Sequence, residues 1–136
     1  MRLHRVVACG CCYLGSYSNI VMRERIYISG PITGYDINER RSKFETVQHY
    51  LEHLCSWKTF NPLKNGLPAD AHRSEHMRED MKQLLKCTAI YMMEGWEQSA
   101  GCQLEFNTAT QIGLSIFFEG QKRWFVQFAT AKYKKK

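Results

Sequence analysis

Two acidic residues stand where a carboxylate could react with a substrate. Glu105 follows the turn Ser99-Ala100-Gly101 and falls near the first turn of a predicted helix. The partial positive charge at a helix N-terminus keeps such a carboxylate ionised and nucleophilic. Asp80 lies on the preceding predicted helix, one position from an apolar stripe that contains Met77 and Met81. Spacing alone leaves two interpretations open for each residue: a catalytic carboxylate, or an ordinary acid on a solvated face or in a first turn.

A glycine-containing loop is the second feature with possible chemistry. The run Ser29-Gly30-Pro31-Ile32-Thr33-Gly34 directly follows a short apolar segment. Backbone N–H groups in such a loop could face an anion. The run has neither the Gly-Lys-Ser/Thr of a P-loop nor the G-x-G-x-x-G of a dinucleotide-binding fold. A plain strand-to-helix turn therefore fits it equally well.

A third pattern imitates a metal site. His72-Arg73-Ser74-Glu75-His76 has the H-x-x-E-H spacing of inverted zinc peptidases. That motif needs one continuous helix, which would place both imidazoles on one face. Ser74 is a predicted helix cap and Pro68 belongs to the loop before it, so His72 should lie outside the helix. No third ligand is apparent, and we expect neither a metal nor any other cofactor.

These residues need a frame that brings them together. Four short segments have the length and bounding turns of strands: 26–28, 59–62, 89–93 and 114–118. Three segments between them have apolar residues at helical spacing, the first beginning at Asp36, the second at Ser74 and the third ending at Gly113. Their expected inner faces are Phe44, Val47, Leu51 and Leu54, then Met77, Met81, Leu84 and Leu85, then Leu104, Ala109 and Ile112. Residues 124–128 fit either a last strand or a helix.

The alternation of strands and helices predicts a parallel sheet with helices on both faces. We expect a single three-layer α/β domain with a four- to five-stranded sheet of the flavodoxin or Rossmann type. Ligands of such sheets bind beyond the carboxyl ends of the strands. The loops of residues 29–34, 63–73 and 94–101 meet there, so the functional residues are expected in or beside them.

Composition and charge exclude several classes of function. The chain has 136 residues, of which 44% are hydrophobic and 24% charged, as in a soluble globular domain. No apolar run approaches the roughly 18 residues of a membrane span, so no membrane partner is expected. The formal charge of +6 gathers at the two ends, and no helix carries a basic face with interleaved aromatic residues. Nucleic-acid binding is therefore not expected, although an accessory protein that uses the basic tail stays a weaker alternative.

The cysteines and the chain ends complete this picture. Cys9 and Cys12 have C-x-x-C spacing without a second pair, and the isolated cysteines lie in apolar segments. Reduced thiols in a cytoplasmic protein fit this pattern. We expect residues 1–21 to be a disordered extension or the product of an upstream start, residues 22–128 to be the domain, and residues 129–136 to be a basic tail.

Taken together, the motifs resemble a known superfamily. They are the run from Tyr27 to Gly34, Asp80-x-x-x-Leu84, and Ser99-x-Gly101-x-x-x-Glu105 followed by Ala109 and Gly113. In this order they are similar to the nucleoside 2-deoxyribosyltransferases and the 2′-deoxynucleoside 5′-monophosphate N-hydrolases. The opening run and the loop Gly95-Trp96-Glu97-x-Ser99 resemble most closely a phage and bacterial branch, DUF4406. The resemblance covers residues 25–119.

The resemblance implies a role for each matching residue. Glu105 matches the nucleophile that attacks C1′ of the sugar and forms a covalent glycosyl intermediate. Asp80 matches a carboxylate that assists near the sugar or the leaving base, and Tyr27 a tyrosine that orients the nucleophile. Ser99 matches a phosphate-binding serine. The implied substrate- and phosphate-binding set is Ser29, Gly30, Thr33, Gly34, Ser99 and Gly101.

The implied function is cleavage of the base–sugar bond of a (deoxy)nucleoside 5′-monophosphate, by a homodimer. Two alternatives stay open: a nucleoside 2-deoxyribosyltransferase, and a protein that binds or sequesters a nucleotide without cleaving it. Three positions depart from the pattern of the relatives. Thr88 stands where an Asp often precedes the third strand, Thr33 where part of the hydrolase branch has a basic residue, and Cys102 makes the segment before Glu105 bulkier.

Overall fold

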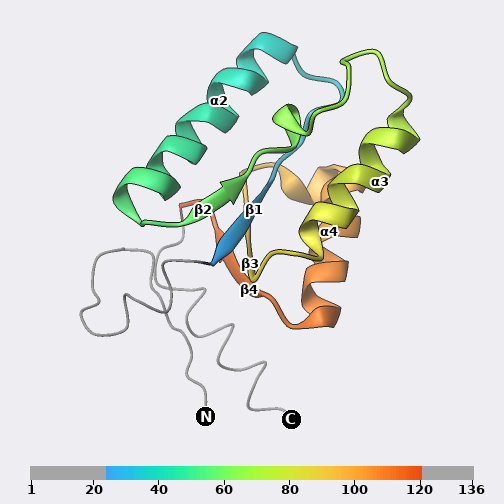
Figure 1. Ribbon diagram of the computed structural model, residues 1–136. Coiled ribbons are helices and arrows are strands. Elements are labelled where there is room, and N and C mark those ends of the chain that lie inside the picture. Colours follow the sequence, from blue (N-terminus) through green and yellow to red (C-terminus); the bar gives the residue numbers. More distant parts are fainter. Residues whose placement is uncertain (1–23, 121–136) are drawn as a thin grey trace, which may run out of the picture.

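The computed structural model describes residues 24–120, so the expected extension 1–21, the segment 124–128 and the tail 129–136 lie outside the described residues. Labels follow Figure 1. The strands are β1 (Arg25–Ser29), β2 (Lys58–Phe60), β3 (Ala89–Met92) and β4 (Ser115–Phe118). The helices are α2 (Ile37–His49), α3 (Arg73–Leu84) and α4 (Ala100–Ile112). Shorter helical segments are η2 (Tyr50–Leu54), η3 (Pro62–Lys64) and η4 (Trp96–Gln98).

The four strands within residues 24–120 form one parallel sheet in the order β2-β1-β3-β4. This order is the one found in flavodoxin-like sheets. From the adjacent strands β1 and β3 the chain leaves toward opposite sides, which makes the crevice above them a topological switch point. The predicted α/β class and the parallel sheet are thus confirmed.

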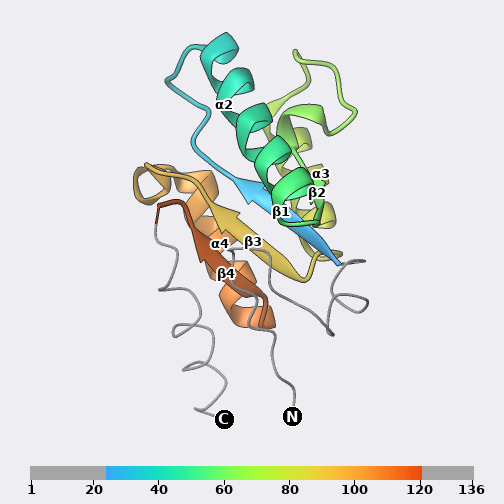
Figure 2. The same ribbon diagram turned by 90° about the vertical axis from the view of Figure 1, so that its left-hand side faces the viewer.

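Helices cover both faces of the sheet and make three layers (Figures 1 and 2). On one face, α2 packs against Ile26 and Ile28 of β1. On the other face, α3 and α4 pack against Tyr27, because successive side chains of a strand point to opposite faces. Tyr27 and Ser29 therefore face the same helices, and both are fully buried.

Two of the predicted helix ends are confirmed, and one is wrong. Asp36 caps α2, with Oδ1 accepting from the N–H groups of Asn38 and Glu39 at 2.9 Å. Gly113 ends α4 in the left-handed conformation, at φ 85°. Helix α3, however, begins at Arg73 and not at Ser74, because the cap is the imidazole of His72, whose Nδ1 accepts from the Ser74 N–H at 3.1 Å.

Four residues expected on inner helix faces are exposed instead: Leu54, Leu85, Leu104 and Ile112. The π-helical geometry of η2 adds a residue per turn and rotates Leu54 away from the sheet. Leu85 is already the C-cap of α3. The buried residues of α4 are Cys102, Glu105 and Ala109. The inner face of this helix therefore contains a carboxylate, whereas the apolar pattern predicted the large residues Leu104 and Ile112 there.

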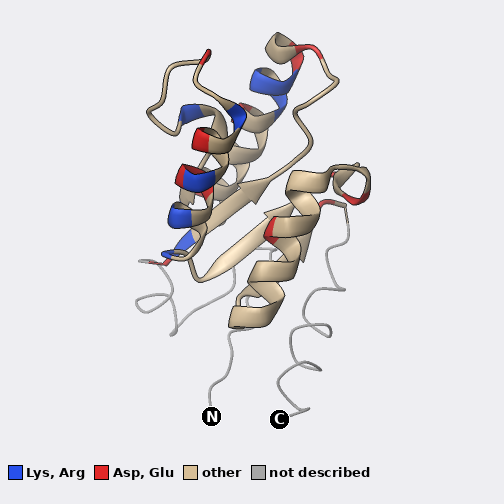
Figure 3. Cartoon of the chain, turned by 90° about the vertical axis from the view of Figure 1, so that its right-hand side faces the viewer, with Lys and Arg blue, Asp and Glu red and all other residues tan. Residues whose placement is uncertain are grey.

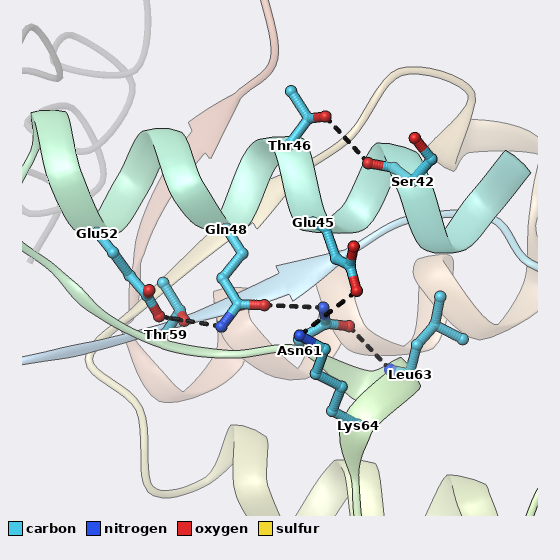
Figure 4. A network of polar contacts seen from close by, with 9 residues as sticks. All are labelled: Ser42, Glu45, Thr46, Gln48, Glu52, Thr59, Asn61, Leu63 and Lys64. Atoms are coloured by element: carbon cyan, nitrogen blue, oxygen red, sulfur yellow. Dashed lines mark hydrogen bonds and ion pairs between the residues drawn. The ribbon is translucent and has the colours of Figure 1, made fainter. Parts of the chain in front are cut away.

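A polar network holds the segment after β2 against α2 (Figure 4). Buried Asn61 donates from Nδ2 to Gln48 Oε1 at 3.0 Å and accepts at Oδ1 from the Leu63 N–H at 2.9 Å. Gln48 and Thr59 both donate to Glu52. This network fixes the start of the loop that contains Asn65. Within residues 24–120, no helix is both long and apolar enough to span a membrane.

Candidate active site

A pocket of about 920 Å³ opens beyond the carboxyl ends of the strands. Its lining comes mainly from the three loops expected at this edge, together with residues of α2, α3 and α4. A volume of this size suits a small organic ligand. Of the nine residues to which the resemblance gives a catalytic or substrate-binding role, six line the pocket: Gly30, Thr33, Asp80, Ser99, Gly101 and Glu105. The other three, Tyr27, Ser29 and Gly34, are not part of its lining.

Glu105 forms part of the pocket and is held by both of its oxygens. Its side chain comes from the inner face of α4 and is only 6% exposed. Tyr27 Oη donates to Oε2 at 2.6 Å, and Ser29 Oγ donates to Oε1 at 2.7 Å. Both donors belong to β1, so strand and helix fix the carboxyl group between them. Ser29, grouped by its sequence with the substrate-binding residues, thus contacts the candidate nucleophile.

The ionisation of Glu105 differs from the sequence expectation. Burial raises the pKa of its carboxyl to about 7, against the lowering effect of the hydrogen bonds from Tyr27 and Ser29, and the nearby Asp80 raises it further. Glu105 is the sixth residue of α4, beyond the first turn where the helix dipole acts strongly. Desolvation therefore outweighs the helix N-terminus. The pKa of Tyr27 lies well above its usual value, chiefly because of burial, which keeps its hydroxyl a donor.

Asp80 provides a second carboxyl group on the pocket wall. Its Oδ1 accepts a hydrogen bond of 2.9 Å from Asn65 Nδ2. Burial raises the pKa of Asp80 to about 6, although the Asn65 hydrogen bond and the nearby His76 oppose this. Two carboxyl groups with raised and unequal pKa values thus share one pocket, an arrangement suited to acid–base and nucleophilic chemistry.

Asn65 and His76 also line the pocket, and sequence reasoning gave neither of them a role there. Asn65 Nδ2 lies 3.1 Å from His76 Nδ1. A polar residue in the loop after β2 was a usable signal for Asn65, because that loop borders the carboxyl edge of the sheet. His76 was considered only as part of the zinc pattern. Within residues 24–120, no three His, Cys, Asp or Glu side chains form a group that could hold a metal ion.

The N-terminus of α4 forms another part of the pocket. Ser99 caps the helix, its Oγ accepting from the Cys102 N–H at 3.3 Å. The N–H groups of Ala100 and Gly101 open the helix and have no acceptor within it. Gly30 lies nearby in the first loop, where a Cβ atom would come within 2.6 Å of Met93 Sδ. This close packing explains the glycine.

A buried cation lies behind this region. Arg40 of α2 is 5% exposed, and its Nε has no hydrogen-bond partner in the part of the chain that is described. Its guanidinium lies 4.9 Å from the ring centre of Tyr35, a residue of the pocket lining. Burial raises the pKa of the Cys102 thiol, and the charge of Arg40 is among the influences that lower it.

Three positions depart from the pattern of the relatives, and two of them line this pocket whereas the third does not. Thr33 lies in the pocket lining, and Cys102 lines the pocket between Ser99 and Glu105. Thr88 lies at the opposite, amino end of β3, where its Oγ1 donates to Glu24 at 3.1 Å. The missing Asp at position 88 is thus remote from the candidate chemistry.

Comparisons with known proteins agree with this architecture. The model of a domain of unknown function, DUF4406, matches residues 24–118. No curated protein matches the chain. Among solved structures, the chain is similar to the Clostridium botulinum CMP N-glycosidase BcmB, with a TM-score of 0.50 and 16% identity over 79% of this chain and 81% of that chain. At this identity the likeness concerns the fold, and it agrees with the superfamily that the sequence motifs resemble. Because the family model covers most of its length, the chain belongs to the DUF4406 family.

Proposed function

We propose that the protein is an N-glycosidase that cleaves the base–sugar bond of a (deoxy)nucleoside 5′-monophosphate, with Glu105 as nucleophile. The observation that carries the proposal is the buried Glu105 carboxyl, held at both oxygens by hydroxyl groups at the edge of a pocket that contains a second carboxyl. Mere binding of a nucleotide needs no such group. The N-glycosidase activity named for the structurally similar BcmB supports the same class of reaction.

The chemistry has two steps. In the first, an ionised Glu105 oxygen attacks C1′ of the sugar and the C1′–N bond breaks. The electron pair of that bond goes to the base, which takes a proton from Asp80. In the second step, water attacks C1′, gives a proton to the Asp80 carboxylate and releases Glu105 from the sugar. The logic is that of retaining glycosidases, with Tyr27 and Ser29 keeping the nucleophile in place.

The two pKa values define the pH dependence of this mechanism. Glu105 attacks only when ionised and has a pKa of about 7, whereas Asp80 donates a proton only when protonated and has a pKa of about 6. Because the pKa of Glu105 is the higher of the two, the reactive form, with Glu105 ionised and Asp80 protonated, is the minor one. Its population is greatest between the two pKa values and falls below about pH 6 and above about pH 7. Base release should therefore peak between about pH 6 and 7 in a bell-shaped profile.

The N-terminus of α4 favours a substrate with a phosphate. The Ser99 hydroxyl and the free N–H groups of Ala100 and Gly101 suit an anion, as helix N-termini generally do. A 5′-phosphate placed there would leave the sugar between this helix end and Glu105, which both line the pocket.

The test is incubation of the full chain with a panel of ribo- and deoxyribonucleoside 5′-monophosphates, followed by chromatography for free base. Rapid quenching and peptide mass spectrometry should find a sugar phosphate attached to Glu105. Appearance of a new nucleoside when a second base is added would assign the protein to the transferases. Tight binding of a nucleotide without release of base or an adduct would assign it to the sequestering proteins.

A further inference from the structure

The side-chain amide of Asn65 has a fixed orientation. Its Oδ1 accepts from the backbone N–H of Leu67 at 3.1 Å. If the amide were flipped, its NH2 group would face the backbone N–H of Leu67, and this hydrogen bond would be lost. The Nδ2 group must therefore face the other way, toward Asp80 and His76.

This orientation determines the state of His76. An amide Nδ2 carries two hydrogens and accepts nothing. One hydrogen goes to Asp80 Oδ1 at 2.9 Å, and the other points to His76 Nδ1 at 3.1 Å. Nδ1 of the neutral imidazole must then be the acceptor, so the hydrogen of that neutral ring is on Nε2. A charged imidazolium would carry a hydrogen on Nδ1 and would break the contact.

The same amide also distinguishes the two oxygens of Asp80. Because Oδ1 already accepts from Asn65, the proton of the neutral acid belongs on Oδ2. The other titratable groups that influence Asp80 come from three elements. They are His76 and Glu79 on α3, Glu105 on α4 and Tyr27 on β1.

We propose that Asn65 is a positioning residue for the leaving base. It orients Asp80 so that Oδ2 carries the transferable proton, and it holds His76 as the Nε2–H tautomer. The pocket wall then offers two hydrogen-bond donors, Asp80 Oδ2–H and His76 Nε2–H, to acceptor atoms on the base. This inference rests on the proposed function for its role in catalysis, whereas the tautomer of His76 follows from the contacts alone.

The tautomer is tested first, without any substrate. In the full chain labelled with ¹⁵N-histidine, the ring nitrogens of His76 are assigned by their loss in His76→Gln, since the chain has 5 histidines. We expect the neutral Nε2–H form in the wild type at pH 8. Asn65→Ala should shift it toward a mixture of tautomers. Asn65→Asp replaces the NH2 group and its two donated hydrogens by one acceptor oxygen, which should draw a proton to Nδ1 of His76.

A matched control separates this effect from a general change of charge. Asn107 is an exposed asparagine of α4, and Asn107→Asp should leave the His76 signals unchanged. An Nδ1–H tautomer in the wild type would overturn the proposal. So would His76 signals that do not respond to Asn65→Ala in a variant with wild-type circular dichroism.

The catalytic role is tested on whichever nucleotide the wild type cleaves. Loss of the Asn65 hydrogen bond should lower kcat about tenfold, with little change in KM. It should also move the acidic limb of the pH profile upward, because that limb follows the lower of the two pKa values and the hydrogen bond lowers the pKa of Asp80. His76→Gln keeps an acceptor for Asn65 and a donor for the base, so it should retain more activity than His76→Leu.

The outcomes separate the two proposals. An unshifted acidic limb in Asn65→Ala, or equal activity of His76→Gln and His76→Leu, would refute the positioning role while leaving the glycosidase intact. Absence of base release from every nucleotide would refute the glycosidase, whereas the tautomer measurement would still decide the role of Asn65 in holding His76.

Discussion

Two glutamates in this protein each accept two side-chain hydrogen bonds, and their ionisation differs in direction. Glu52, in the network of Figure 4, accepts from Thr59 and Gln48, and the pKa of its carboxyl is lowered, chiefly by the bond from Thr59. Glu105 accepts from Tyr27 and Ser29, yet burial raises its pKa to about 7. Hydrogen-bond donors thus do not decide the ionisation of a carboxyl group, because loss of water around it can outweigh them.

Figure 3 shows where the charged residues lie on the helices and loops. Helix α4 has a single charged residue, Glu105, and turns it inward. Glu52 lies in η2 and stays partly exposed. Ionisation of Glu52 therefore costs little free energy, whereas ionisation of Glu105 opposes folding. Such a cost is expected of a group placed for reactivity.

The strongest test of the contrast is activity. Glu105→Gln removes the nucleophile but keeps the shape of the side chain, so base release should fall by a factor of about a thousand or more. Glu52→Gln makes the same chemical change outside the pocket and should leave the rate within about twofold. Both rates are measured at pH 6.5 on the nucleotide that the wild type cleaves. Near-equal losses in the two variants would remove the special role of Glu105.

Stability should change in the opposite direction at the two positions. The folded chain binds the proton of Glu105 up to a pH of about 7, whereas the unfolded chain releases it near 4.5. The free energy of unfolding therefore falls as the pH rises through this window, and the loss is complete above it. This shift corresponds to about 3 kcal/mol.

Glu105→Gln cannot ionise and should exceed the wild type in stability by up to about 3 kcal/mol at pH 8, with no difference near pH 4. Glu52→Gln loses a partly exposed, favourably ionised group and should be slightly less stable at pH 8, by about 0.5 kcal/mol or less. Urea denaturation at the two pH values measures both. Equal stability of wild type and Glu105→Gln at pH 8 would mean that burial does not hinder ionisation of Glu105.

Ser99 sharpens the contrast because it lines the same pocket without holding Glu105. Ser99→Ala removes a hydrogen bond to a charged phosphate, worth about 1.5–3 kcal/mol, and should lower kcat/KM for the monophosphate about ten- to a hundredfold. Cleavage of the matching nucleoside without phosphate should hardly change. An equal loss on both substrates would place Ser99 outside the phosphate site, and a wild-type preference for nucleosides would favour the transferase.

The smallest expected effect concerns the donors themselves. Tyr27→Phe removes one of the two hydrogen bonds that lower the pKa of Glu105. The alkaline limb of the pH profile follows the higher of the two pKa values, so it should move upward by about one unit. Thr59→Val makes the equivalent change at Glu52 and should leave the profile in place. An unmoved limb in Tyr27→Phe would show that the limb reports another group.

Local pattern was sufficient to predict most of the fold. Strands β1, β3 and β4 are short, largely apolar runs bounded by turn residues, and the caps Asp36 and Gly113 are single residues with strong local preferences. Which face of a helix turns inward was less accessible. The apolar pattern of α4 pointed to Leu104 and Ile112, whereas the sheet selects the stripe that lets Glu105 reach β1.

The candidate site was predictable where a motif carried it, as for Glu105, Asp80 and Tyr27. Asn65, His76 and Arg40 were missed because their significance lies in tertiary contacts between separate elements. Even the raised pKa of Glu105 depends on such packing, since the sequence alone indicated a helix N-terminus and hence easier ionisation.

The two hydroxyl donors to Glu105 also make the site depend on the register of β1. Tyr27 and Ser29 are two positions apart on β1, and Ile26 and Ile28 occupy the alternate positions toward α2. Slipping β1 by a single residue would exchange these two sets, because side chains alternate along a strand. Both hydroxyls would leave the carboxyl group together and isoleucines would replace them. A one-residue insertion or deletion within β1 should therefore remove both hydrogen bonds to Glu105 at once and leave no residual activity.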